Sequence, residues 1–218
     1  MELNDIWARV GDREVFQGLS LRSSAQLLGV IGPNGAGKSS LLRLLQGLLK
    51  AHRGQLEIEG PAGLVFQNPD HQLLFPTVME ELTFGLTQRG SSLETARQEA
   101  QRLAHRYGAQ RILTMASHEL SAGQKTLVCL LAVLMDQPKI ILLDESFANL
   151  DLFTARQMTH LIRSTQLKVV FSTHQLHLLH DFEEVIWLDQ GRVQLQGPPS
   201  RVLPAYEDWA KGQLGSPC

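Results

Sequence analysis

The segment that decides the fold runs from residue 27 to residue 39 and reads LLGVIGPNGAGKS. Its first five residues, Leu27–Ile31, predict a strand that is buried on both faces, as strands are in parallel sheets. The next eight, Gly32 to Ser39, match the pattern G-x-x-x-x-G-K-[ST], which joins a strand to a helix. Leucines from Leu41 to Leu49 follow at helical spacing. The segment therefore predicts a strand–loop–helix unit of an α/β protein.

Residues 32–39 have the composition of a phosphate-binding loop. Glycines let backbone N–H groups turn inward toward an anion, and the N-terminal end of the following helix adds positive potential. Lys38 can carry its charge to the β- and γ-phosphates, and Ser39 can offer its hydroxyl to Mg²⁺. We expect contacts with a nucleotide from Asn34, Gly35, Ala36, Gly37, Lys38, Ser39 and Ser40.

Short apolar runs alternate with helical patterns along the rest of the chain. These runs are Leu64–Phe66, Ile140–Leu143, Val169–Phe171 and Val185–Leu188, and they predict further strands of a parallel sheet. Residues 1–30 instead have the pattern of short strands and turns, and residues from about 70 to 135 are mostly helical in pattern. We predict an α/β P-loop NTPase core, an N-terminal antiparallel β subdomain and an inserted helical subdomain over about 70–135. The 218 residues fit one domain.

Composition limits the classes of function. Hydrophobic residues make up 43% of the chain and charged residues 19%, which excludes a disordered chain. The 20 basic and 22 acidic residues give a net charge of −2, so no nucleic-acid partner is expected. The sequence has no apolar run of about 18 residues and no N-terminal signal pattern, so we expect no membrane span. Two cysteines are too few for a disulfide framework and favour a cytoplasmic protein.

Two carboxylates follow the apolar run Ile140–Leu143. The carboxyl ends of parallel strands face the ligand crevice of an α/β sheet, so Asp144 and Glu145 are expected there. Asp144 would hold Mg²⁺, directly or through water, and Glu145 would polarise a water molecule for attack on a γ-phosphate. Alone, the pair is more typical of a solvated junction between a strand and a loop. Beside a complete phosphate-binding loop, it predicts phosphate chemistry.

The run Leu120-Ser121-Ala122-Gly123-Gln124 resembles the L-S-G-G-Q signature of ATP-binding cassette (ABC) ATPases. Spacing alone indicates only a helix that begins here with Ser121 as its cap. The resemblance implies a head-to-tail dimer, in which the signature of one subunit closes over ATP held by the phosphate-binding loop of the other. Ser121, Gly123 and Gln124 would then contact ATP bound to a second ATPase subunit, in a homodimer or a heterodimer.

Other motifs of the same family occur in order, and the resemblance covers roughly residues 1–200. Gln67 resembles the Q-loop glutamine, which touches Mg²⁺ and the attacking water and couples to a membrane partner. Residues 148–151, Ala-Asn-Leu-Asp, resemble the D-loop at the dimer interface, and His174 resembles the switch histidine at the γ-phosphate. The resemblance implies catalytic roles for Lys38, Gln67, Glu145 and His174, and a Mg²⁺ site at Ser39, Gln67 and Asp144.

Residues 65–78 narrow the resemblance further. Asn68-Pro69-Asp70 is a good turn sequence by itself, but the stretch is similar to the Q-loop region of energy-coupling factor ATPases of cobalt, nickel and vitamin importers. That implies an ATP-hydrolysing subunit at the inner face of the cell membrane, which powers an integral membrane importer by ATP-driven dimer closure. Two alternatives remain: a non-transport ABC ATPase, and a partner-dependent or degenerate nucleotide-binding regulatory half of a heterodimer.

Three positions depart from the family pattern and motivate the degenerate alternative. Val10 stands near the place of an aromatic residue that stacks on adenine; either Trp7 or Phe16 replaces that residue, or stacking on the base is weak. Ala122 replaces the first glycine of the signature pair and needs φ below zero or mild strain. Ser146 replaces the proline that usually follows the catalytic carboxylate, which restores a backbone N–H.

Overall fold

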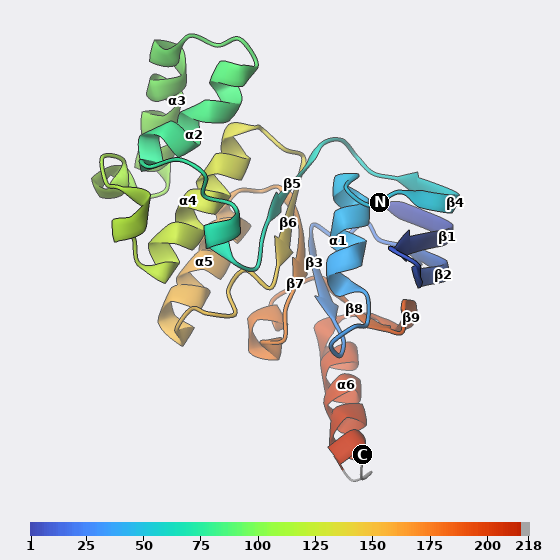
Figure 1. Ribbon diagram of the computed structural model, residues 1–218. Helices are drawn as coiled ribbons and strands as arrows, with labels where there is room; N and C mark the ends of the chain where they lie inside the picture. Colours follow the sequence, from blue (N-terminus) through green and yellow to red (C-terminus); the bar gives the residue numbers. More distant parts are fainter. Residues whose placement is uncertain (215–218) are drawn as a thin grey trace.

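The computed structural model describes residues 1–214 and contains two sheets and six α-helices in that part of the chain (Figure 1). The strands are β1 (Glu2–Val10), β2 (Arg13–Arg22), β3 (Leu27–Ile31), β4 (Ala51–Glu57), β5 (Ala62–Val65), β6 (Ile140–Asp144), β7 (Lys168–Ser172), β8 (Glu184–Asp189) and β9 (Arg192–Gly197). The helices are α1 (Lys38–Gln46), α2 (Val78–Gln88), α3 (Leu93–Arg106), α4 (Ala122–Met135), α5 (Leu152–Ser164) and α6 (Pro199–Leu214). Short 3₁₀ helices are η1 (Pro69–His71), η2 (Gln110–Ile112), η3 (Ser117–Glu119) and η4 (Leu176–Leu179).

The larger sheet has the strand order β5-β6-β7-β3-β8-β9. Its first five strands run parallel, and β9 pairs with β8 in the antiparallel direction at the edge. All five residues of β6 and of β7 are buried, as expected for strands covered on both faces. The predicted parallel sheet is therefore confirmed. The order places the carboxyl ends of β5, β6, β7 and β3 side by side along one edge.

The smaller sheet has the order β2-β1-β4 and is antiparallel, which confirms the predicted N-terminal β part. Helix α1 stands between the two sheets (Figure 1). Its leucines Leu41, Leu42, Leu44 and Leu45 are buried in one apolar cluster with residues of both sheets. This packing fixes the helix that follows the phosphate-binding loop, and with it the direction of the helix axis.

Helices α2, α3 and α4 lie on the far side of the larger sheet from the smaller one (Figure 1). Helix α3 buries Ala96, Ala100 and Ala104, which are spaced four residues apart and permit close approach of its neighbours. Helix α4 contacts both α2 and β5, so it joins the helical region to the sheet. None of the helices within residues 1–214 combines the length and the apolar character needed to cross a membrane.

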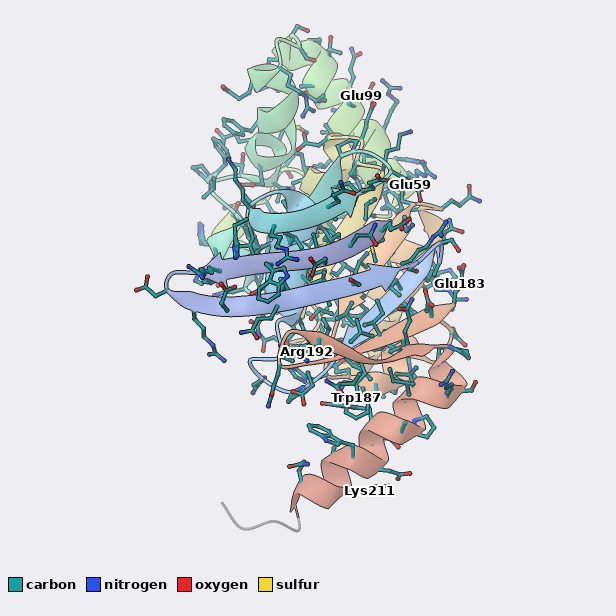
Figure 2. The ribbon with its side chains drawn as sticks, turned by 90° about the vertical axis from the view of Figure 1, so that its right-hand side faces the viewer. Glu59, Glu99, Glu183, Trp187, Arg192 and Lys211 are labelled. Carbon is teal, nitrogen blue, oxygen red and sulfur yellow. The ribbon has the colours of Figure 1, made fainter. Side chains whose placement is uncertain are left out.

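Helix α6 was not predicted. Pro204 lies inside it and discourages a helical interpretation of its sequence, whereas Pro199 occupies the first position, where proline is well tolerated. Contacts with β8 hold it in place: the ring centroid of Trp187 lies 5.4 Å from that of Tyr206 and 5.2 Å from that of Trp209. Figure 2 shows Trp187 beside this helix, which extends away from the sheets.

Cys129 in α4 offers a direct test of this packing. Its side chain is fully buried, and burial raises the pKa of its thiol to about 12. Only about one thiol in ten thousand is then a thiolate at pH 8, so iodoacetamide should not label Cys129 in the native protein. We expect mass spectrometry of a Cys218→Ser variant to show labelling only in denaturant; Cys218 lies outside the described residues. Rapid labelling of the native variant would contradict the described burial of α4.

Candidate active site at the ends of the parallel strands

Four adjacent strands bring the predicted catalytic side chains together. Gln67 follows β5, Glu145 follows β6, His174 follows β7 and Lys38 follows β3. One carboxylate oxygen of Glu145 lies 2.8 Å from His174 Nε2 and 3.5 Å from Lys38 Nζ. The other accepts a hydrogen bond of 3.2 Å from Gln67 Nε2. The side chains of Lys38, Gln67 and His174 therefore all converge on the carboxylate of Glu145.

The phosphate-binding loop joins β3 to α1 and needs glycine at its first position. Gly32 has a φ of 150°, and a Cβ there would lie 2.0 Å from the backbone oxygen of Leu188 in β8. Residues 34–40, which were predicted to contact a nucleotide, all line one cavity of about 1210 Å³ together with Gln67 and Glu145. The start of the loop, at Gly32, is thus packed against the sheet, and the rest of the loop, residues 34–40, faces this cavity.

Lys38 is held inside the loop, with 5% of its side chain exposed. Its ammonium group donates to the backbone oxygens of Gly32 (3.0 Å) and Pro33 (3.2 Å) and lies 3.3 Å from His174 Nε2. Burial lowers the pKa of Lys38, and the nearby carboxylates of Glu145 and Asp144 oppose that shift. These contacts place a cationic group at the centre of the loop.

The predicted Mg²⁺ ligands Ser39 and Asp144 also meet. The Ser39 hydroxyl donates a hydrogen bond of 2.9 Å to Asp144 Oδ1, and burial raises the pKa of the Asp144 carboxyl. Hydroxyl and carboxylate oxygens are the ligands that Mg²⁺ prefers. Within residues 1–214 no group of three or more His, Cys, Asp or Glu side chains is arranged to hold a metal, so phosphate and water oxygens would have to complete this set. The residues fit Mg²⁺ held jointly with a phosphate.

The signature residues lie elsewhere in the chain's structure. Ser121 caps α4: its hydroxyl accepts from the backbone N–H of Gln124, whose side-chain oxygen accepts from the N–H of Ser121. Ala122 begins α4 without a positive φ, so the strain considered for it does not arise. A Cβ at Gly123 would lie 2.7 Å from Thr154 Cγ2 of α5. None of residues 121–124 lines the cavity of the phosphate-binding loop.

Neither Trp7 nor Phe16, the two candidates to replace the adenine-stacking ring, lines the cavity, which leaves weak stacking of the base as the alternative. Phe16 is fully buried and packs beneath Gly37, where a Cβ would be 3.1 Å from its ring. Trp7 donates to Asp5, and the guanidinium of Arg53 lies 5.5 Å from its ring centroid. The cavity wall formed by β1 and β2 instead presents aliphatic, charged and amide side chains; these are Val10, Arg13, Glu14, Val15 and Gln17.

Sequence reasoning missed the turn between β8 and β9. Asp189, Gln190, Gly191 and Arg192 line the same cavity, and the N–H of Gly191 donates to the backbone oxygen of Ala36 at 2.9 Å. The pair Gln190-Gly191 is a turn signal in the sequence, but nothing there indicates that the turn supports the phosphate-binding loop.

Comparison with known proteins decides the family. Residues 17–148 match the family model for the ABC transporter domain. The chain belongs to the ABC transporter family. The biotin transport ATP-binding protein BioM of Rhodobacter capsulatus is 39% identical over 204 residues, which are 88% of this chain and 87% of that protein. The energy-coupling factor transporter ATP-binding protein EcfA of Methanocaldococcus jannaschii is 29% identical, and the alignment covers 100% of this chain and 85% of that protein.

Among solved structures, cbiO1 of Clostridium perfringens, described as part of the ABC transporter complex cbiONQ, matches with a TM-score of 0.84. It is 26% identical, and the match covers 98% of this chain and 94% of that one. These findings confirm the predicted family, the α/β fold class and an ABC ATPase.

Proposed function

We propose that this chain is the ATPase subunit of a membrane importer for a vitamin or a metal ion. The observation that carries the proposal is the convergence of Lys38, Gln67, His174 and Glu145 beside a phosphate-binding loop. The names of the relatives, which refer to biotin transport and to an energy-coupling factor transporter, support this class of cargo. We further propose that residues 1–218 act as one domain, with about 70–135 as its helical subdomain.

In this proposal, the phosphate-binding loop positions ATP. Backbone N–H groups of residues 34–40 and the amine of Lys38 hold the β- and γ-phosphates, and the N-terminal end of α1 adds positive potential. The bound phosphates compete with the Glu145 carboxylate for the ammonium group of Lys38, because this carboxylate and the ammonium group lie 3.5 Å apart in this structure. Ser39, Asp144 and Gln67 would hold Mg²⁺, which neutralises charge on the phosphate oxygens when it is bound.

Glu145 is the general base for hydrolysis. Its carboxylate accepts a proton from water as the water oxygen bonds to the γ-phosphorus, and the bond from that phosphorus to the β–γ bridging oxygen breaks. The Gln67 amide, at 3.2 Å, orients one carboxylate oxygen, and we propose that His174, at 2.8 Å from the other, contacts the γ-phosphate. Catalysis thus depends on positioning and charge neutralisation.

A second ATPase subunit completes the site. Ser121, Gly123 and Gln124 lie outside the cavity of their own chain, so we propose that they contact ATP held by the partner subunit. Closure of the two subunits around ATP then moves an integral membrane protein at the inner face of the cell membrane. Homodimer and heterodimer are both compatible with this arrangement, and no nucleic-acid partner is proposed.

One observation favours the second candidate, a regulatory half of a heterodimer: the cavity wall from β1 and β2 has no aromatic residue for the base. Val10 lies on this wall and is 46% exposed. If the base rests there, Val10→Tyr should tighten Mg-ATP binding about twofold to tenfold, the worth of one aromatic stacking contact. Isothermal titration calorimetry measures this, with Leu48→Tyr, exposed and outside the cavity, as the control. Unchanged affinity in Val10→Tyr would place the base elsewhere.

The importer proposal is tested by the proteins that co-purify with the chain. A tagged Glu145→Gln variant, extracted from its native membranes in mild detergent with Mg-ATP, should retain an integral membrane protein. Mass spectrometry of the complex identifies that protein, and omission of detergent is the control. Recovery with DNA or with ribosomes, and without a membrane protein, would contradict the importer and support a non-transport ABC ATPase.

A further inference from the structure

We propose that Ser146 is a positioning residue that ties the turn carrying Glu145 to the end of β5, from which the Gln67 loop begins. Ser146 itself does not touch the reacting atoms. It acts by fixing the position of the Glu145 carboxylate relative to the Gln67 amide. The inference rests on the proposed function, because it assumes that both side chains act on ATP.

The backbone at Glu145 needs support from its surroundings. Strand β6 ends at Asp144, and Glu145 has a φ of 48°, in the left-handed region that residues with a side chain rarely occupy. One contact comes from β7, where the backbone oxygen of Ser172 accepts from the N–H of Glu145 at 2.9 Å. The chain therefore leaves the sheet in a sharp turn, and the next residue, Ser146, lies at the base of it.

Ser146 supplies the contact on the opposite side. Its side chain is buried, with 3% exposed, and its hydroxyl donates to the backbone oxygen of Val65 at 2.9 Å. Val65 is the last residue of β5 and the partner of Leu143 in the last register pair between β5 and β6. The hydroxyl thus connects the two strands beyond the point where their own pairing ends.

Two hydrogen bonds join the segment that carries Gln67 to the segment that carries Glu145. Val65 stands two residues before Gln67, and Ser146 follows Glu145 directly; the Gln67 amide and the Glu145 carboxylate meet at 3.2 Å. The hydrogen bond from Ser146 to Val65 is the buried one of the two. Without that hydroxyl, the exposed hydrogen bond between Gln67 and Glu145 is the remaining side-chain hydrogen bond between these two loops among the described residues.

Steady-state kinetics of Ser146→Ala test the inference, in the purified protein with whatever partner subunits the wild type needs for turnover. We expect kcat to fall about threefold to tenfold, as for loss of one buried hydrogen bond, while KM for ATP changes less than about twofold. Ser146→Thr keeps the hydroxyl and should restore most of the lost kcat. Ser117→Ala is the matched control. Ser117 also donates a hydrogen bond from its hydroxyl to a backbone oxygen, that of Phe75, at a distance of 2.7 Å, but this contact lies outside the site.

A double-mutant cycle with Gln67→Ala separates positioning from a general loss of stability. If Ser146 acts through the contact between Gln67 and Glu145, Ser146→Ala should cost less than about 1.5-fold in kcat once Gln67 is alanine. Independent losses that multiply, or equal losses in Ser146→Ala and Ser117→Ala, would overturn the inference. If Gln67→Ala and Glu145→Gln leave turnover unchanged, the proposed function itself fails, which is a different result.

Hydrogen–deuterium exchange gives a readout that needs no turnover. In Ser146→Ala, peptides that cover residues 65–72 and 145–147 should exchange faster than in the wild type, and peptides of α3 should not change. Unchanged exchange over residues 65–72 would overturn the inference, whatever the activity of the variant.

Discussion

Lys38→Met is expected to weaken the binding of Mg-ATP by about 10- to 150-fold. Lys38 is the buried cationic group of the phosphate-binding loop, and its ammonium group is held by the backbone oxygens of Gly32 and Pro33. A hydrogen bond to a charged group contributes about 1.5–3 kcal/mol, which corresponds to this range of affinity. Methionine keeps the length of the apolar stem and removes only the charge and its donors.

Isothermal titration calorimetry at fixed ionic strength measures the change. Lys50→Met is the matched control, because Lys50 is exposed and does not line the cavity. It should bind Mg-ATP as the wild type does. Wild-type affinity in Lys38→Met would mean that the phosphates do not lie against this loop, and the site would have to be placed elsewhere.

Glu145→Gln is expected to lower the rate of ATP hydrolysis by about 10²- to 10⁴-fold, the range for removal of a general base. Glutamine preserves the shape of the side chain but cannot take a proton from water at neutral pH. Binding of Mg-ATP should be unchanged or tighter, because the carboxylate that faces Lys38 at 3.5 Å has lost its charge. The variant should therefore hold ATP without turning it over.

Phosphate release under saturating Mg-ATP measures this effect, and calorimetry measures the affinity. Glu207→Gln is the control: Glu207 is an exposed carboxylate on α6, outside the cavity, and its loss should not affect turnover. Normal phosphate release in Glu145→Gln would remove Glu145 from the role of general base. His174 would then be the next candidate, since it lies 2.8 Å from the same carboxylate.

The centre of the fold could be predicted because local pattern and global topology agree there. The strand predicted at Leu27–Ile31 has those bounds in the structure, and β6 and β7 extend the predicted runs by one or two residues. Parallel strands end at the same edge of a sheet, so residues that follow β5, β6, β7 and β3 had to come close together. Convergence of Gln67, Glu145, His174 and Lys38 follows from that order.

Features that depend on tertiary contacts could not be predicted. Pro204 opposes a helix locally in α6, and the contacts of Tyr206 and Trp209 with Trp187 of β8 form only in the folded chain. The directions in which Trp7 and Phe16 point depend on the packing of the smaller sheet against α1. Ser146 looked like a simple departure from a family pattern, because its partner Val65 is 81 residues away in the sequence.

We propose that two ATPase subunits close around ATP held by the phosphate-binding loop of one and Ser121–Gln124 of the other. The most direct test is the mass of the Glu145→Gln variant, measured by size-exclusion chromatography with light scattering. We predict the mass of two subunits with Mg-ATP and of one subunit without it. The mass of a single subunit at saturating Mg-ATP, for the chain alone and mixed with any ATPase subunit that co-purifies with it, would contradict the claim.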